Sequence, residues 1–207
     1  SDPAPVAEAG QLGQESIESL LVDRSGNLWI GTPSALVMRT SAGVLSRHAA
    51  EDFVRNPWVS ALFEDRDGNL WVGSTSESLF RFWGGWASRL NQRDGLTEAV
   101  VWSLARDPQG QLVIGTNSNV MRRGRNGMEM LIDGTRLPNP VAYELTYDSR
   151  GRLWIGTRAG LARLDAQGTD PLRIDAIGSA QVNVVIEADE ERIWIGTSDG
   201  VFRWIDG

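Results

Sequence analysis

The feature that most constrains this chain is a ten-residue string that returns at a nearly constant interval. DRSGNLWIGT begins at Asp23, and related strings begin at Asp65, Asp107, Asp148 and Ala188. The equivalent points are Trp29, Trp71, Val113, Trp154 and Trp194, which are 42, 42, 41 and 40 residues apart. A period of this length is typical of one four-stranded propeller blade. Because one such unit cannot bury its apolar surface alone, we expect the copies to stack against each other.

Each copy predicts a series of short strands joined by tight turns. An apolar run of strand length precedes the motif and is expected to be the innermost strand, as in VSALFED before Trp71. The turn that follows pairs an Asp, which can bond the turn backbone, with a Gly, which tolerates positive φ. These pairs are Asp23 with Gly26, Asp65 with Gly68, Asp107 with Gly110, and Asp148 with Gly151. LWIGT is then the second strand, and its Trp is expected to be core between adjacent sheets.

The sequence therefore predicts an all-β fold with one β-propeller domain over residues 1–207. It has five four-stranded blades, or is a five-blade portion of a larger propeller. The expected repeats are about 15–55, 56–97, 98–139, 140–180, and 181–207 together with 1–14. The last unit stops after its third strand. We expect the segment from Pro5 to Leu12 to supply the fourth strand and so close the ring.

Charge and composition exclude several classes of function. The net charge of -7 argues against nucleic-acid binding, which needs clustered Lys and Arg. The absence of cysteine excludes disulfides and thiolate sites, and the single histidine, His48, supports neither a catalytic triad nor a site with several His ligands. No apolar run reaches the ~18–20 residues of a membrane span. We expect no metal or cofactor, and membrane attachment only through segments absent from this chain.

One column of the repeat differs from its uniformly apolar neighbours. The second position of each inner strand is polar or aromatic and changes from blade to blade: Glu18, Ser60, Trp102, Tyr143 and Asn183. Such variation on a symmetric scaffold is what a ligand pocket would show, and it is equally what unconstrained solvent at the mouth of the channel would show. Both interpretations stay open at this point.

Loops expected on the same face add further candidates. They contribute Asn56, Trp58, Glu98, Asn139, Gln181, Ser76, Glu77, Asn117, Asn119, Arg158 and Asp199. Trp58, Trp102 and Tyr143 are candidate platforms for a sugar ring or an aromatic compound. The cluster of Phe82, Trp83 and Trp86 is expected at a hairpin on the opposite face, where packing within the blade is favoured over a partner surface.

The repeat consensus, D-x-x-G-N-L-W-I-G-T followed by Gly-Leu and an Arg, resembles the two-component regulator propeller repeat. The resemblance covers about residues 15–205 and is best at 23–32, 65–74 and 148–163. It departs at Val113 and across 188–192. Linking stretches such as RFWGGWASRLNQRDGLTEAVVWSL are similar to the versions attached to diguanylate cyclases. The resemblance implies an extracytoplasmic, periplasmic sensor region of a hybrid histidine kinase or diguanylate cyclase. It also implies that the repeat motif is structural and supplies no catalytic residues.

Three functional hypotheses follow from the sequence. The first is a non-catalytic sensor module that binds an unknown small molecule, a carbohydrate or another protein, with self-association as a further option. The second is a lyase or hydrolase with an axial site, using Glu18, Glu144 or Tyr143 as acid or base. It is disfavoured because paired carboxylates with matched spacing are absent. The third is a protein-interaction scaffold.

Overall fold

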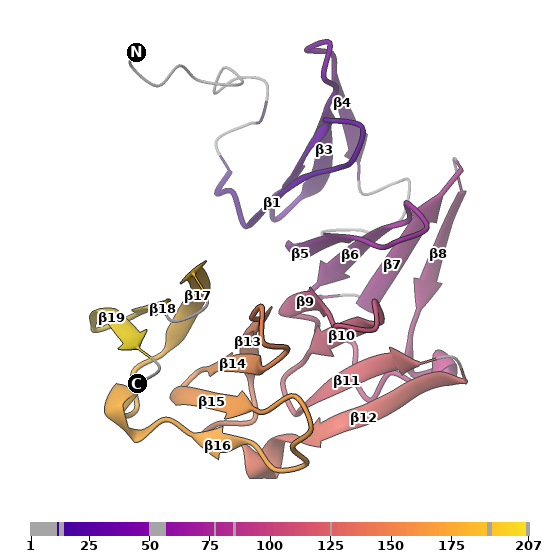
Figure 1. Cartoon of the computed structure of the whole chain (residues 1–207). Coiled ribbons are helices and arrows are strands. Elements are labelled where there is room, and N and C mark those ends of the chain that lie inside the picture. Colours follow the sequence, from indigo (N-terminus) through magenta and orange to yellow (C-terminus); the bar gives the residue numbers. More distant parts are fainter. Residues whose placement is uncertain are drawn as a thin grey trace, which may run out of the picture.

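The computed structural model describes residues 12, 15–49, 57–76, 78–84, 86–124, 126–189 and 192–205. Within them the strands form five antiparallel sheets, of which four have four strands and one has three. We call these sheets blades one to five in chain order. Figure 1 shows them side by side along an arc, with blades one and five at its two ends. The predicted all-β, propeller-like architecture is confirmed, whereas a closed ring and its blade count stay predictions.

The bounds of the strands follow the repeat. Blade one contains β1 (Ser19–Val22), β2 (Leu28–Gly31), β3 (Ala35–Arg39) and β4 (Leu45–Ala49). Blade two contains β5 (Val59–Glu64), β6 (Leu70–Ser74), β7 (Ser78–Trp83) and β8 (Trp86–Leu90). Blade three contains β9 (Ser103–Arg106), β10 (Leu112–Gly115), β11 (Asn119–Gly124) and β12 (Gly127–Asp133). Blade four contains β13 (Ala142–Tyr147), β14 (Leu153–Thr157), β15 (Gly160–Leu164) and β16 (Leu172–Arg173). Blade five contains β17 (Val182–Asp189), β18 (Arg192–Thr197) and β19 (Gly200–Ile205).

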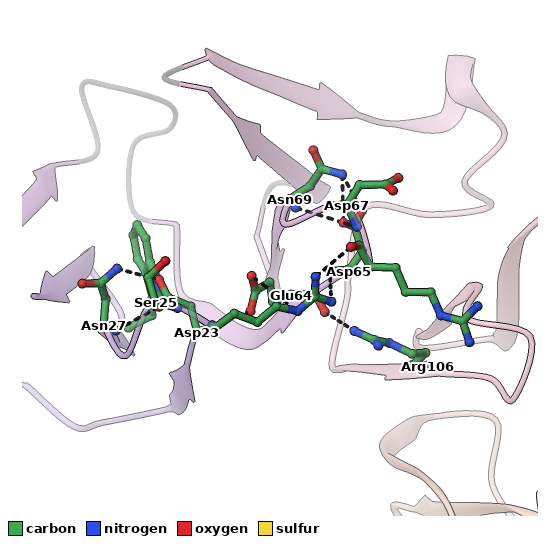
Figure 2. A network of polar contacts seen from close by, with 11 residues as sticks. Asp23, Ser25, Asn27, Glu64, Asp65, Asp67, Asn69 and Arg106 are labelled. Atoms are coloured by element: carbon green, nitrogen blue, oxygen red, sulfur yellow. Dashed lines mark hydrogen bonds and ion pairs between the residues drawn. The ribbon is translucent and has the colours of Figure 1, made fainter. Parts of the chain in front are cut away.

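The turn between the first two strands of a blade is built on its Asp, as the sequence predicts. In blade two, Asp65 Oδ1 accepts the backbone N–H groups of Asp67 at 3.0 Å and Asn69 at 2.9 Å, and Oδ2 accepts Trp71 Nε1 at 2.8 Å. Figure 2 shows this turn beside the equivalent one at Asp23. Burial by itself raises the pKa of Asp65, but the bonds donated by Trp71, Asn69 and Asp67 lower it below its usual value. Gly68 closes the turn with a φ of 79°.

Packing between blades makes the core. Trp71 is buried in one cluster with Leu79 of its own blade and Val101 and Ile114 of blade three. Two residues after Trp71, a Cβ added to Gly73 would lie only 2.7 Å from Cγ1 of Val101. The motif therefore needs a large indole to fill the interface and a glycine to let the next blade approach.

The expectation that every motif Trp is core is wrong at Trp194. Trp71 and Trp154 are fully buried and Trp29 is half-buried, but Trp194 in β18 is exposed. Its indole lies on the face of blade five that points away from blade four, since the side chains on the other face, such as Ile193 and Ile195, form the core shared with blade four. Within the described residues, no further blade covers that face.

The predicted closing strand lies almost wholly outside the described residues. Its one described member, Leu12, packs against the cluster of Ile30, Ala35 and Val37 in blade one. The described part of blade five ends with β19 as an edge strand. The candidate loop residues Asn56 and Glu77 also lie outside the described residues.

Candidate functional site

The variable column occupies the start of each inner strand. Ser60, Tyr143 and Asn183 are the second residues of β5, β13 and β17. Glu18 and Trp102 lie directly before β1 and β9, and their N–H groups already bond the second strand, at Gly31 and Gly115 respectively, both at 2.9 Å. The backbone of every blade thus places its candidate residue at the same point of the fold.

The structure brings two of these residues into contact. The rings of Trp102 and Tyr143, from blades three and four, meet edge to face with their centroids 4.7 Å apart and an interplanar angle of 88°. Trp102 Nε1 donates to Asn117 Oδ1 at 2.7 Å, which fixes the orientation of the indole. Both aromatic rings are half-buried. They form a platform that crosses the boundary between two blades, which we call the axial aromatic pair.

The other members of the column make local bonds. The Ser60 hydroxyl donates to Val101 O at 2.5 Å and so joins blades two and three. Glu18 accepts from Ser16 Oγ at 2.5 Å, and Asn183 accepts from Gln181 Nε2 at 2.7 Å. Ser60 therefore has a structural use, and Glu18 and Asn183 keep their polar groups near solvent.

Two of the loop candidates, Trp58 and Arg158, are exposed. Trp58 has the unusual backbone φ of 36° for a bulky residue, and its N–H donates to Pro33 O at 2.9 Å. The N–H of Arg158 donates to Val141 O at 3.3 Å. Strain is common at functional positions, which keeps Trp58 among the candidates.

Glu144 is the one described carboxyl whose pKa is moved far upward. It is the third residue of the inner strand of blade four, and burial between blades four and five raises its pKa to about 7. The Thr146 hydroxyl, which lies 2.8 Å from Glu144 Oε1, and a backbone bond to Val185 act in the opposite direction. In other blades this column holds Ser19, Ala61, Ser103 and Val184. In the sequence, Glu144 stands out because it is the carboxyl residue in a column that otherwise holds small or apolar residues.

A hollow lies between blades one and two. It is a groove of about 710 Å³ whose walls include Trp29, His48, Phe82, Trp83 and Trp86. The rings of Trp29 and His48 stack at a centroid distance of 5.9 Å, and Trp86 is among the most exposed large side chains described. Two carboxylates, Asp23 and Glu64, also line it. We call this hollow the aromatic groove.

The aromatic groove was not foreseen as a site. The sequence favoured packing within the blade for Phe82, Trp83 and Trp86, whereas the structure exposes both tryptophans. His48 Nε2 is buried and has no hydrogen-bond partner among the described residues. The available signal in the sequence was the position of two tryptophans beside the pair Gly84-Gly85. The face that they share with Trp29 and His48 is created only by the packing of two blades.

The repeat that builds these sites matches a known family model. The model of the two-component regulator propeller matches residues 11–34, 54–76 and 136–159, which contain the motifs around Trp29, Trp71 and Trp154. Three of the five repeats of this chain thus resemble the two-component regulator propeller repeat. The unmatched repeats are those in which Val113 replaces the Trp and in which the segment 188–192 has lost the Asp and Gly of the turn.

Solved structures with a similar fold include two extracellular domains of bacterial two-component systems. One belongs to a protein described as a hybrid two-component system, BT3049 of B. thetaiotaomicron, with a TM-score of 0.80 and 16% identity; it covers 92% of this chain and 28% of that one. A second, from BT4673 of the same organism, has a TM-score of 0.69 and 17% identity, covering 94% of this chain and 32% of that one. At these identities the likeness shows the fold alone.

The same fold also occurs in an enzyme. Virginiamycin B lyase from Staphylococcus aureus matches with a TM-score of 0.69 and 15% identity, covering 92% of this chain and 70% of that one. This chain thus spans about a third or less of the two extracellular domains and 70% of the lyase. A comparison with curated protein sequences gives no significant match. In the part of the chain that the structure describes, no helix has the length and apolarity to cross a membrane.

Proposed function

We propose that this chain is an extracytoplasmic sensor module of a bacterial membrane-bound signalling protein, located in the periplasm. The observation that carries the proposal is the family match at three repeats, together with the likeness in fold to extracellular domains of two-component systems. The parent protein would then supply a histidine kinase or diguanylate cyclase as the output domain. Transmission of a signal would require that the ligand bind one arrangement of the attached segments more tightly than another. A ligand with equal affinity for both arrangements would not shift the equilibrium between them.

The proposed ligand site is the axial aromatic pair. Trp102 and Tyr143 present apolar ring surface and a phenol hydroxyl at one point, and Asn117 holds the indole in place. A half-buried, oriented indole suits the apolar face of a sugar ring, and the neighbouring phenol supplies a directional hydrogen bond. The ligand class that these groups support is a neutral carbohydrate.

Binding of neutral disaccharides, measured by isothermal titration calorimetry, tests this proposal. Removal of the stacking surface in Trp102→Ala is expected to weaken binding at least tenfold, and Tyr143→Phe by a smaller factor because only the hydroxyl is lost. Trp86→Ala, which removes an exposed indole at the aromatic groove, is the matched control and should bind like the unaltered chain. Failure of every disaccharide to bind at millimolar concentration, or equal binding by Trp102→Ala, contradicts the proposed site.

We infer that the module does no chemistry of its own. Glu144 has the raised pKa of a general acid, but its carboxyl is tied to Thr146 and to Val185 at the contact of two blades. Such bonds suit a structural role. The enzyme alternative is tested by incubating the chain with quinupristin, which was crystallised with an inactive virginiamycin B lyase. Linearisation or cleavage of this compound that Glu144→Gln abolishes would establish a lyase instead.

The aromatic groove favours a second candidate function, that of a protein-interaction scaffold. Exposed tryptophans beside a concave surface are typical of the places where partner side chains insert. A scaffold of this kind would lose its partner on substitution of Trp86 and keep it on substitution of Trp102. Pull-down with the two variants against the parent signalling protein's other domains therefore separates the scaffold from the carbohydrate sensor.

A further inference from the structure

The third strand of each blade places one residue directly opposite the motif Trp or its replacement, Val113. This residue is Arg81, Arg122, Arg163 and Arg203 in blades two to five, and Met38 in blade one. Where the motif has its Trp, the guanidinium lies over the indole: Arg81 over Trp71 and Arg163 over Trp154, both at 5.7 Å from the ring centroid, and Arg203 over Trp194 at 5.9 Å. Because the face of an indole attracts cations, these blades supply the cation for their own Trp.

Blade one lacks this cation. Its Trp29 lies opposite Met38, and the ring stacked on Trp29 is the imidazole of His48, at 5.9 Å. The next blade supplies no guanidinium either, since the position from which Arg123 reaches Trp71 at 4.9 Å is held in blade two by Phe82. Among the described residues, no arginine therefore lies over Trp29.

The aromatic groove lies at this same place. Its volume of about 710 Å³ is within the range of small-molecule pockets, about 300–1,000 Å³. Of the three tryptophans in its walls, Trp83 is already covered by Arg81 at 5.1 Å. Trp29 and Trp86 carry no guanidinium from the described part of the chain, and Trp86 is 72% exposed. The groove thus offers two indoles to a cation from outside.

Negative charge lines the groove beside these rings. Asp23 and Glu64 both belong to its walls, and Figure 2 shows the two residues on neighbouring blades. Burial by itself raises the pKa of Asp23, but the bonds donated by Asn27, Trp29 and Ser25 lower it below its usual value, so its carboxylate is ionised. Arg24 Nε lies 4.0 Å from Glu64 Oε1 and offsets that charge, whereas Asp23 makes no ion pair with any described residue.

The hydrogen bonds of Asp23 decide which kind of cation fits. Its two oxygens already accept the N–H groups of Ser25 and Asn27, the amide of Asn27 and the indole N–H of Trp29. A guanidinium or a primary ammonium brings several N–H groups that each need an acceptor. A quaternary ammonium brings none, and needs only ring faces and a negative field.

We propose that the aromatic groove binds a small quaternary ammonium compound, with its cationic head against Trp29 and Trp86. The ligand then occupies at Trp29 the role that Arg81 has at Trp71. This assigns a small molecule to the groove in place of a partner's side chain. The site shares no residue with the axial aromatic pair, so the failure of either proposal leaves the other untouched.

Choline is the probe that tests the ligand class. Titration calorimetry of the unaltered chain with choline chloride, at constant ionic strength, should show binding at millimolar concentration or below. The neutral carbon analogue of choline, in which a tert-butyl group replaces the trimethylammonium group, should bind at least tenfold more weakly. Equal binding of the two compounds, or no binding of choline, overturns the proposal. So does tighter binding of methylguanidinium than of choline, which would favour an arginine side chain of a protein partner.

Substitution of Met38 tests the position of the cation. Met38→Arg gives blade one the arginine that the other blades have, so its guanidinium should cover Trp29 and weaken choline binding at least tenfold. Met38→Leu, which adds no charge, is the matched control and should bind choline like the unaltered chain. Circular dichroism establishes that both variants are folded. Unchanged choline binding by folded Met38→Arg overturns the proposal.

Two further variants address the walls of the groove and do not depend on Met38. Trp86→Ala should weaken choline binding severalfold, whereas Trp194→Ala, at an exposed indole that Arg203 already covers, should not. Glu64→Gln keeps an acceptor for the backbone N–H of Arg24 but removes a charge, so it should weaken choline binding and leave binding of the neutral analogue unchanged. Choline binding by Trp86→Ala that equals binding by Trp194→Ala contradicts the assigned site.

Discussion

The indole Nε1 of Trp154 donates a hydrogen bond to Asp148 Oδ2 at 2.8 Å, across the turn that joins β13 and β14. The equivalent bonds join Trp29 to Asp23 at 2.9 Å and Trp71 to Asp65 at 2.8 Å. Both groups of the Asp148–Trp154 pair are buried, so neither finds water when its partner is removed. In blade three Val113 replaces the Trp, and Asp107 Oδ2 is buried without a hydrogen-bond partner among the described residues.

Asp148→Ala is expected to destabilise the protein by about 2–4 kcal/mol, since it leaves buried N–H groups of Trp154 and Arg152 unpaired. Asp107→Ala should cost less because no indole depends on it. Thermal unfolding followed by circular dichroism measures the difference, with a fall in Tm of about 2–4 °C expected per kcal/mol. Equal losses in the two variants would contradict the role assigned to the indole bond.

Glu144 is expected to make stability fall as the pH rises. Burial raises its pKa to about 7 in the folded state, above the ordinary value of 4.5, so the folded protein holds this proton more tightly than the unfolded chain. The contribution of Glu144 to the free energy of unfolding is therefore fully present below about pH 4.5 and is lost as the pH rises toward 7.

Glu144→Gln removes this titration. The stability of the variant relative to the unaltered chain should rise by about 1–3 kcal/mol between pH 4.5 and pH 8. Urea unfolding at the two pH values measures it, and Glu129→Gln, at an exposed carboxyl of blade three, is the control. A relative stability that is the same at both pH values would show that Glu144 titrates normally.

Arg24 links blade one to blade two. Its guanidinium donates to the backbone carbonyls of Asp65 at 2.6 Å and Arg66 at 2.7 Å, while its own N–H donates to Glu64 Oε2 at 2.9 Å. Arg24→Ala should cost about 1 kcal/mol, because these bonds are exposed to solvent. Hydrogen exchange should speed up in residues 15–49 and stay unchanged in 126–189. Uniform acceleration would instead indicate global destabilisation.

Gly73→Ala tests the close approach of blades two and three. The added Cβ would lie 2.7 Å from Val101 Cγ1, so the blades must separate or Val101 must move, at a cost of about 1–3 kcal/mol. Gly168→Ala, at an exposed position with φ outside the left-handed region, brings its Cβ no nearer than 3.3 Å to another atom, the Asp165 carbonyl oxygen, and should cost clearly less than Gly73→Ala. Chemical denaturation compares the two, and equal effects would refute the steric explanation.

The candidate site was only partly visible in the sequence. The variable column that contains Trp102 and Tyr143 was recognised by its contrast with apolar neighbours, and its position at the start of the inner strands is confirmed. Their contact was not predictable, because the two residues are 41 positions apart and meet only when blades three and four pack. The aromatic groove escaped prediction for the same reason, since His48 and Trp86 belong to different blades.

What the sequence by itself determined is the blade. The turn at Asp148, the bond to Trp154 six residues later and the glycine of LWIGT all depend on residues that are close together in the sequence. Features of this kind can be recognised in the sequence because the same residues recur in each repeat. Only the tertiary structure decided what each copy does. Trp154 and Trp194 hold the same position in the string WIGT, yet one is buried and the other exposed, because burial depends on whether another blade lies against the face. Whether a blade has such a neighbour depends on the arrangement of all the blades, and the sequence of a single repeat does not encode it.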